Sequence, residues 1–70
     1  MVKTTDFEYN IEQNLFVHNE SDFMLDGDFV LLFDDAMVSS LFFGATGCEI
    51  SSTTLEDLRA IVREHTEEQV

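Results

Sequence analysis

Carboxylates are the most abundant side chains in this sequence that could do chemistry, and two close pairs stand out. These are Asp26 with Asp28, and Asp34 with Asp35. One member of such a pair can work as a general acid when burial or a close like charge raises its pKa. A calcium-binding loop of the D-x-D-x-D-G type with its later glutamate is absent. We therefore interpret both pairs as turn and surface residues rather than as catalytic or metal-binding residues.

One cysteine and two histidines are the remaining candidates for a nucleophile or a metal ligand. Cys48, His18 and His65 are far apart in the sequence and show no short ligand spacing. Glu49 follows Cys48, and its negative charge disfavours a reactive thiolate. Phosphate-binding, dinucleotide-binding and nucleophile-elbow motifs are absent as well. The sequence thus predicts a protein without catalytic residues, metal ions or cofactors.

The distribution of charge is the most informative feature of the chain. Its 70 residues contain 15 acids and 3 bases, for a net charge of −12. No lysine or arginine lies between Lys3 and Arg59, while twelve acids do. A globule of this length has a diameter of about 28 Å, which gives about one charge per 2.3 Å, against about one per 1.7 Å of duplex DNA. Direct binding to nucleic acid is not expected, because phosphate contacts need lysine and arginine.

A protein partner with a basic groove suits such a surface, since opposite charges steer association and release counterions. Grooves of this kind are typical of proteins that themselves bind nucleic acid. We predict that the following acids contact the partner: Asp6, Glu8, Glu12, Glu20, Asp22, Asp26, Asp28, Asp34 and Asp35. Two alternatives stay open, in which the acids serve solubility alone or adaptation to high salt.

Aromatic residues offer a second means of binding a partner. The chain has seven phenylalanines, more than the core of one small sheet and one helix requires. We expect most of them to be core and one or two to be exposed as interface anchors. In this alternative the protein is a small oligomerising or adaptor domain. If a whole face of the sheet stays open, a homodimer would cover it.

Local patterns predict the elements that hold these side chains. Polar and apolar residues alternate from Asp6 to Glu12, as in a strand with one buried face, and residues 15–17 form a second strand. The Asp26-Gly27 pair predicts a type I′ hairpin turn between strands at 23–25 and 29–33, with a further strand at 37–43. We favour these strands over a helix that ends at Gly44, because four apolar side chains would lie unburied on its far side.

A helix is predicted at the end of the chain. Thr53 and Glu56 have the spacing of a capping box, with Thr53 as the N-cap. The apolar positions behind it recur at helical spacing and are Leu55, Leu58, Ile61, Val62 and His65. The predicted fold class is α+β, a small antiparallel β-sheet of three to five short strands packed by one C-terminal helix at about residues 54–68. We expect a single domain over residues 1–70, with a loose N-terminus at residues 1–5.

In its length, its base-free stretch from Thr4 to Leu58 and its acidic clusters at residues 6–12 and 26–35, the chain resembles the small acidic inhibitors that bacteriophages encode. These include DNA-mimic proteins and some anti-CRISPR proteins. The resemblance implies a stoichiometric inhibitor that occupies the nucleic-acid channel of a host CRISPR effector, restriction enzyme, repair nuclease or RNA polymerase, in the host cytoplasm. We expect neither a secretory signal nor a membrane span, which needs about 20 apolar residues.

Overall fold

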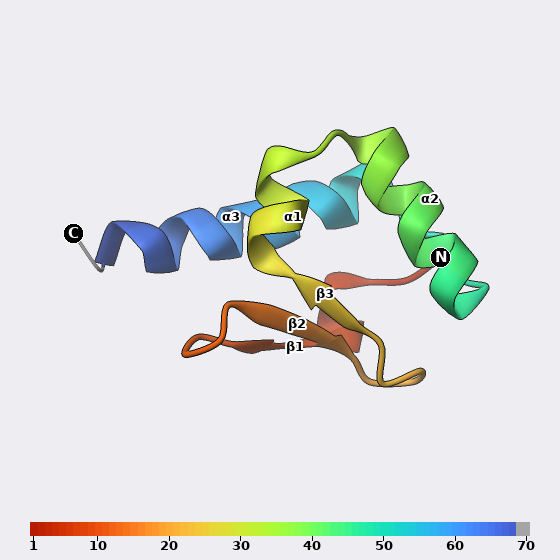
Figure 1. Ribbon diagram of the computed structural model, residues 1–70, viewed down its shortest axis with the longest axis horizontal. Helices are drawn as coiled ribbons and strands as arrows, with labels where there is room; N and C mark the ends of the chain where they lie inside the picture. The colour runs from red at the N-terminus through yellow and green to blue at the C-terminus, as the bar shows by residue number, and fades with distance from the viewer. Residues whose placement is uncertain (69–70) are drawn as a thin grey trace.

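In the computed structural model, which describes residues 1–68, three helices lie on one face of a three-stranded antiparallel sheet (Figure 1). In chain order the elements are a short 3-10 helix η1 (Thr4–Asp6), β1 (Phe7–Asn10), β2 (Leu15–His18), β3 (Met24–Asp26), α1 (Gly27–Leu32), α2 (Asp35–Thr46) and α3 (Ser52–Glu68). The predicted α+β class is confirmed, including the small antiparallel sheet and the C-terminal helix.

The sheet has an inner face toward the helices and an outer face toward solvent. Phe7 pairs with His18 in β1–β2, and Phe16 pairs with Leu25 in β2–β3. These four residues are buried, whereas the residues between them along the strands are more exposed, as the pleat of a strand requires. The first strand therefore follows the predicted alternation. It stops two residues before Glu12, which lies in the turn.

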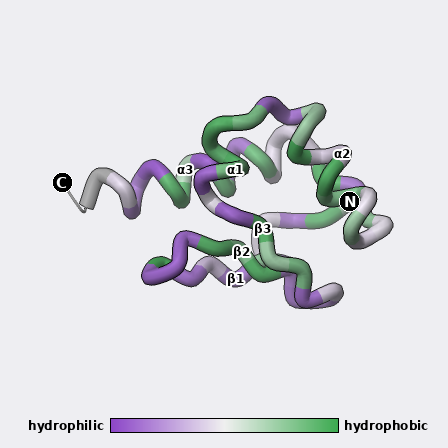
Figure 2. Tube along the Cα trace, viewed as in Figure 1, coloured by the Kyte–Doolittle hydropathy of each residue, from purple (hydrophilic) through white to green (hydrophobic). Residues whose placement is uncertain are grey.

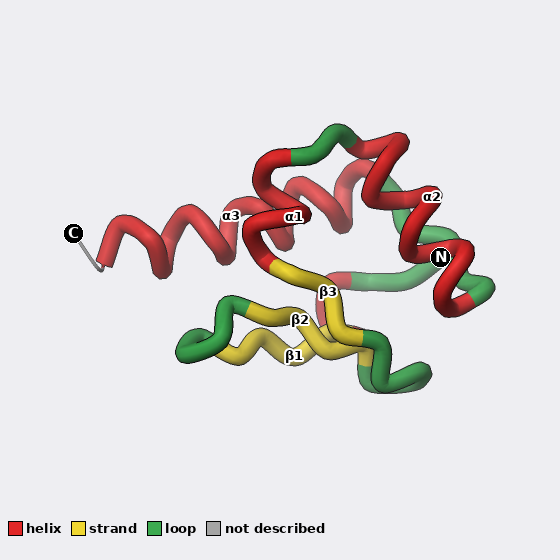
Figure 3. The backbone as a smooth tube through the Cα atoms, viewed as in Figure 1, coloured by secondary structure: helices red, strands yellow, loops and turns green. Residues whose placement is uncertain are grey.

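Residues 27–46 form two helices, so the preference for strands in the middle of the chain is wrong (Figure 3). The Asp26-Gly27 pair starts a helix instead of making a type I′ hairpin turn. The side chain of Asp26 accepts a hydrogen bond from the backbone N–H of Asp28 at 2.8 Å, which makes Asp26 the N-cap of α1. Aspartate favours both turns and helix caps, so this pair of residues does not distinguish them locally.

Both ends of helix α2 are capped by the residues that flank it. The side chain of Asp34 accepts a hydrogen bond from the N–H of Met37 at 2.8 Å. At the other end Gly47 adopts a left-handed conformation, with a φ of 74°, and donates its N–H to the carbonyl of Phe43 at 2.8 Å. The helix considered as the alternative ends at Gly44, a residue that the structure places inside α2.

A short break separates α1 from α2, and both helices bury the side that was expected to face solvent. Phe33 and Asp34 separate the two helices, so each has its own rotational phase. Val30 of α1 is buried, and so are Val38 and Phe42 of α2. These three are among the four apolar side chains that were expected to lie unburied on the far side of a helix, so the structure removes the argument that favoured strands.

Helix α3 is the predicted C-terminal helix with a different cap. The Oγ of Ser51 accepts a hydrogen bond from the N–H of Thr54 at 3.2 Å, so Ser51 and not Thr53 caps the helix. The apolar stripe of α3 belongs to the core, as the sequence predicts. Its fully buried members are Leu55, Leu58 and Val62.

The first residues are docked against the rest of the protein, and the expectation of a loose N-terminus is wrong. Val2 is 7% exposed. Its N–H donates to the carbonyl of Glu49 at 3.0 Å, and its carbonyl accepts the hydroxyl of Thr54 at 3.0 Å. The hydroxyl of Thr4 donates to Asp57 at 2.8 Å. All of these partners are distant in sequence, so residues 1–5 alone do not signal the contacts.

Aromatic rings fill the space between the sheet and the helices. Phe42 of α2 contacts three of them, with ring centroids 5.2 to 6.0 Å apart. These rings belong to Phe7, His18 and Phe23. Phe33 and Phe43 stay about half exposed, which agrees with the expectation that one or two phenylalanines remain outside the core. Within residues 1–68 no helix combines the length and hydropathy that crossing a membrane requires.

Candidate acidic binding surface

The acidic side chains stay at the surface of the folded protein. Of the thirteen acids within residues 1–66, for which burial is described, eleven are exposed. Asp6 and Asp35 are partly buried. A carboxylate in contact with water is ionised at neutral pH, so folding does not hide the excess of negative charge.

Folding does hide one of the three bases, Arg59 of α3, which is 6% exposed. Its Nε donates to the carbonyl of Val30 at 2.9 Å, and its Nη2 donates to the carbonyl of Phe33 at 3.1 Å. Its Nη1 donates to Asp35 at 2.5 Å and to Glu56 at 3.3 Å. Arg59 therefore joins the end of α1 and the start of α2 to α3, and it pairs carbonyls that the end of a helix leaves without partners.

The burial of Arg59 makes the surface still more acidic. Among residues 1–68, Lys3 and Arg63 are the bases that remain exposed. Hydrogen bonds from Arg59, and then from Ser52, hold the pKa of Asp35 below its usual value of 3.8. Asp35 is therefore the predicted binding acid least suited to a partner, because its charge is already paired inside the protein.

Four of the other predicted acids also have structural roles. Asp26 and Asp34 cap α1 and α2. Asp6 accepts the backbone N–H of Lys3, the residue before η1, at 2.9 Å, and Asp28 accepts the side-chain amide of Asn14 at 3.0 Å. Replacing any of these four would change stability as well as charge.

The remaining predicted acids carry charge without a visible structural role. Within residues 1–68, no hydrogen bond or ion pair involves the side chains of Glu8, Glu12, Glu20 or Asp22. All four residues are exposed. Asp22 has a positive φ of 61°, which aspartate tolerates better than most residues. The three glutamates can therefore be replaced with the least disturbance of the backbone.

Most of the predicted acids fall into three groups, each around a hollow of the surface. The hairpin group surrounds the turn between β1 and β2 and consists of Glu8, Glu12 and Asp28. The terminal group lies beside the N-terminus and consists of Asp6, Glu20 and Glu49. The junction group lies where α1, α2 and α3 meet and consists of Asp34, Asp35 and Glu56. Asp22 and Asp26 lie outside these groups.

Asp6, Glu8 and Glu12 do not form a continuous row of acids along the first strand, because β1 is too short to include all three. Glu8 lies on β1, whereas Asp6 lies in η1 and Glu12 lies in the turn. Glu49 was not among the predicted acids. It reaches the terminal group because the adjacent Ile50 forms a parallel bridge with the N-terminal segment, and no local pattern in the sequence announces that bridge.

A small polar network holds the hairpin group in place. The hydroxyl of Tyr9 donates to Oδ1 of Asn14 at 2.5 Å, and Nδ2 of Asn14 donates to Asp28. The carbonyl of Asn14 accepts the N–H of Gly27 at 2.8 Å. Burial, and then the negative charge of Asp28, raise the pKa of the Tyr9 hydroxyl, which therefore stays protonated and able to donate. The network connects the hairpin turn to the start of α1.

The histidines and the cysteine are not gathered into a reactive site. His18 is fully buried, with Nδ1 2.6 Å from Oγ of Ser21, and Cys48 is partly buried. His65 stacks on Tyr9, with ring centroids 5.3 Å apart. Among the side chains described for residues 1–66, no group of three histidine, cysteine or acidic residues is arranged to hold a metal ion. What the described surface offers a ligand is mainly charge.

This charge is spread over an elongated body. The principal extents are 36, 22 and 16 Å. Twelve net charges over 36 Å amount to one per 3 Å. This is sparser than the spacing estimated for a sphere, because the protein is longer. It stays within a factor of about two of the one charge per 1.7 Å of duplex DNA.

Comparisons with known proteins give no further guidance. No protein-family model, curated protein or solved structure matches this chain. The charge, exposure and shape of the surface are therefore the basis for assigning a function.

Proposed function

We propose that the protein is a non-catalytic inhibitor that occupies the basic groove of a nucleic-acid-binding protein, in the manner of a DNA mimic. The exposure of the acids together with the burial of Arg59 is the observation that carries this proposal. An ordinary soluble domain mixes both signs of charge on its surface. This chain places its acids outside and uses an arginine inside, which produces a surface that repels nucleic acid and attracts a basic groove.

Inhibition would follow from replacing a polyphosphate by carboxylates. Lysines and arginines in the groove that normally contact phosphates would contact the acids instead, with release of counterions. The bound protein would then exclude nucleic acid from the groove by its charge and shape, and it would not catalyse any reaction. The partner is then a host CRISPR effector, restriction enzyme, nuclease or polymerase. The site of action is the host cytoplasm if a bacteriophage encodes the chain.

The hairpin group is the best candidate for the central contact. Glu8 and Glu12 have no structural role, and Asp28 adds a third carboxylate beside them. The turn between β1 and β2 projects at one end of the sheet (Figure 1). A projecting turn can enter a groove more deeply than a flat surface can, so its charges would approach the basic residues most closely.

Affinity capture with competition tests the proposal. The immobilised protein is incubated with bacterial lysate at about 50 mM and about 500 mM salt, and the bound proteins are identified. We expect nucleic-acid-binding proteins at low salt, their loss at high salt, and their displacement by duplex DNA. If the captured proteins resist both salt and DNA, the proposal is wrong.

Two matched charge reversals locate the contact. Glu12→Lys in the hairpin group and Glu64→Lys on α3 both replace an exposed acid and change the net charge equally. We expect Glu12→Lys to weaken binding to a captured partner by about tenfold at low salt, and Glu64→Lys to weaken it much less. Equal effects would mean that total charge matters and the hairpin does not. A Glu12→Lys variant with full inhibition would contradict this placement.

The exposed aromatic side chains support a second candidate function, that of a small oligomerising or adaptor domain. Phe33 and Phe43 are about half exposed, and hot spots of protein interfaces are often aromatic. In this case the acids serve solubility. Partner binding would then survive high salt and be lost in a Phe43→Ala variant, the reverse of what a DNA mimic predicts.

A further inference from the structure

The outer surface of α2 is uncharged, although the protein as a whole is strongly acidic. Residues 36–48 include no acidic, basic or histidine residue. Val38 and Phe42 point into the core. The large side chains on the outer side are Met37, Leu41 and Phe43, each 47% to 52% exposed. Hydrophobic and neutral colours accordingly run along most of α2 in Figure 2.

The shape of this surface allows another helix to come close. Ala36, Ser40 and Gly44 follow one another at intervals of four residues, which places them on the same side of α2. Apart from the neighbouring residues and the backbone of α2 itself, no atom lies within 4 Å of the point where a Cβ on Gly44 would stand. Larger apolar side chains border this strip of small residues on both sides.

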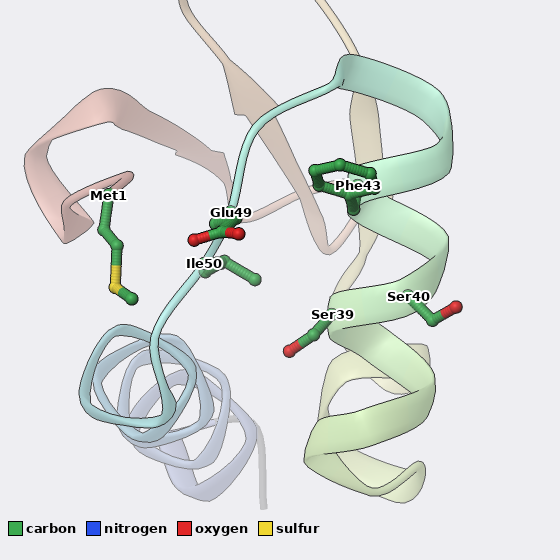
Figure 4. A pocket seen from close by; sticks show the side chains of 6 residues that line it. All are labelled: Met1, Ser39, Ser40, Phe43, Glu49 and Ile50. Atoms are coloured by element: carbon green, nitrogen blue, oxygen red, sulfur yellow. The ribbon is translucent and has the colours of Figure 1, made fainter.

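An open hollow of about 400 Å³ adjoins the strip (Figure 4). Its lining consists of Met1, Ser39, Ser40, Phe43, Glu49 and Ile50. In Figure 4 the side chain of Ser39 points from α2 toward Ile50 on the opposite wall. Glu49 supplies the one carboxylate of this lining, and the other side chains that line the hollow are uncharged. The hollow has room for an apolar side chain of a second molecule.

We infer that two copies of this chain associate through α2 as a symmetric dimer. In a two-fold dimer a surface meets its own copy, so a charge close to the axis faces the same charge. A surface rich in acids would oppose such an association. The α2 surface does not oppose association, because apolar and small polar side chains can pack against identical side chains of a second copy without charge repulsion. A basic partner, by contrast, would find no charged side chain at residues 36–48 to bind.

The outer face of the sheet is less suited to a second copy. Val17 and Met24 lie there side by side, but Glu8 stands next to Val17 in the register and Asp26 lies on the same face. In a symmetric dimer these acids would come close to their copies. A homodimer over the open sheet, as considered from the sequence, is therefore disfavoured relative to one through α2.

The available area is enough for a weak dimer. A helix of twelve residues is about 18 Å long and about 11 Å wide, so the outer half of α2 presents about 300 Å². Leu32 and Phe33 are exposed beside the start of α2 and add about 200 Å². Each copy could therefore bury about 500 Å², which reaches the lower limit of about 1,000 Å² for a specific interface.

This dimer and the proposed function depend on different surfaces, and salt separates them. Two copies of charge −12 repel each other, so added salt strengthens the dimer by screening that repulsion. Binding to a basic partner weakens with salt for the opposite reason. Failure of one therefore does not imply failure of the other.

Sedimentation velocity on the full chain measures the association. Between about 5 and about 500 µM protein, we expect the mean mass to rise from 8.0 kDa toward twice that value, as a small interface requires. The midpoint should move to lower protein concentration when the salt is raised. A chain that remains monomeric over this range at high salt would overturn the inference.

A charge placed at the centre of the α2 strip tests the location. Ser40→Glu adds one acid to the exposed side of α2, and Ala60→Glu adds one acid to an exposed position of α3. We expect Ser40→Glu to raise the dimer dissociation constant by about tenfold or more, and Ala60→Glu to raise it much less. If the two variants dimerise equally well, the interface is not at α2.

Cysteine cross-linking gives a readout that does not depend on weakening the dimer. In a Cys48→Ser background, Ser40→Cys places a thiol near the two-fold axis and Ala60→Cys places one away from it. We expect mild oxidation to produce a disulfide-linked dimer from the Ser40→Cys protein at a far higher yield than from the Ala60→Cys protein. Equal yields, or no cross-linked dimer, would contradict the inference.

Discussion

Arg59 donates hydrogen bonds to two backbone carbonyls and two carboxylates, and so brings residues from three helices together. Its sequence context gives no sign of this role, since an arginine on an acidic helix usually lies in solvent. Only the approach of α1 and α2 to α3 provides the partners. At the scale of single residues, the function of a charged side chain here depends on contacts that are remote in sequence.

Replacing Arg59 should therefore cost far more stability than replacing an exposed arginine. We expect Arg59→Met to lower the free energy of unfolding by about 2 to 3 kcal/mol, because it leaves the carbonyls of Val30 and Phe33 without partners. Arg63→Met on the same helix should change it by about 0.5 kcal/mol or less. Urea denaturation of both variants measures the difference. Equal losses would show that Arg59 is not a structural anchor.

Asp35 should make the stability depend on pH in the acid range. Its pKa is lowered in the folded protein, so its ionised form stabilises the fold above the usual value of 3.8, and this contribution is lost as the pH falls through the lowered pKa. We expect Asp35→Asn to be less stable than the wild type at pH 7 and at pH 5, with the gap narrowing as the pH falls below the usual value of 3.8. Denaturation at these pH values measures the gap. A gap independent of pH would assign the loss to shape and not to charge.

At the scale of elements, the residues at the ends of α1 and α2 indicate helices more clearly than the residues in the middle of these helices do. The caps Asp26, Asp34 and Gly47 are all of the residue types that end or start helices. Aspartate followed by glycine or by another acid also occurs in turns, and β-branched Val30 and Val38 suit strands as well as helices. The choice between strand and helix was therefore made by burial and not by local preference. The first two strands and α3 were predictable because the alternation in β1, the short apolar run in β2 and the helical spacing in α3 are local patterns.

Two glycines inside helices should respond oppositely to alanine. At Gly27 a Cβ would stand 2.1 Å from Oδ1 of Asn14, whereas at Gly44 no atom beyond the adjacent residues and the helix's own backbone lies within 4 Å. We expect Gly27→Ala to destabilise the protein by about 1 to 3 kcal/mol through overpacking. Gly44→Ala should stabilise it by about 0.5 to 1 kcal/mol through helix propensity. Chemical denaturation at low protein concentration measures both effects, so that association through α2 does not contribute.

A second variant distinguishes overpacking at Gly27 from a general change in α1. Asn14→Ala removes the atoms that the new Cβ would meet, so Gly27→Ala should cost less in that background. If the cost of Gly27→Ala is the same with and without Asn14, the contact between the hairpin turn and α1 does not limit the packing.

At the scale of the whole molecule, self-repulsion should dominate the response to salt. The net charge is −12, and both ion pairs found among the described side chains of residues 1–66 are made by Arg59. We expect the Tm to rise by about 5 °C between low salt and about 0.5 M NaCl, since screening relieves repulsion worth about 1 kcal/mol. A Glu8→Lys/Glu12→Lys variant, with a net charge less negative by four, should gain less. A Tm that falls with salt would mean that the ion pairs outweigh the repulsion.

By itself, the sequence determined the sign and excess of charge, the α+β class, the first two strands and the apolar face of α3. These follow from composition and from uninterrupted periodicity, which a chain carries without reference to its fold. The tertiary structure alone decided the helices at residues 27–46, the burial of Arg59, the docking of the N-terminus and the separation of the acids into groups. The physical reason is that these features depend on contacts between residues that are far apart in the chain, and no local pattern encodes which of those residues meet.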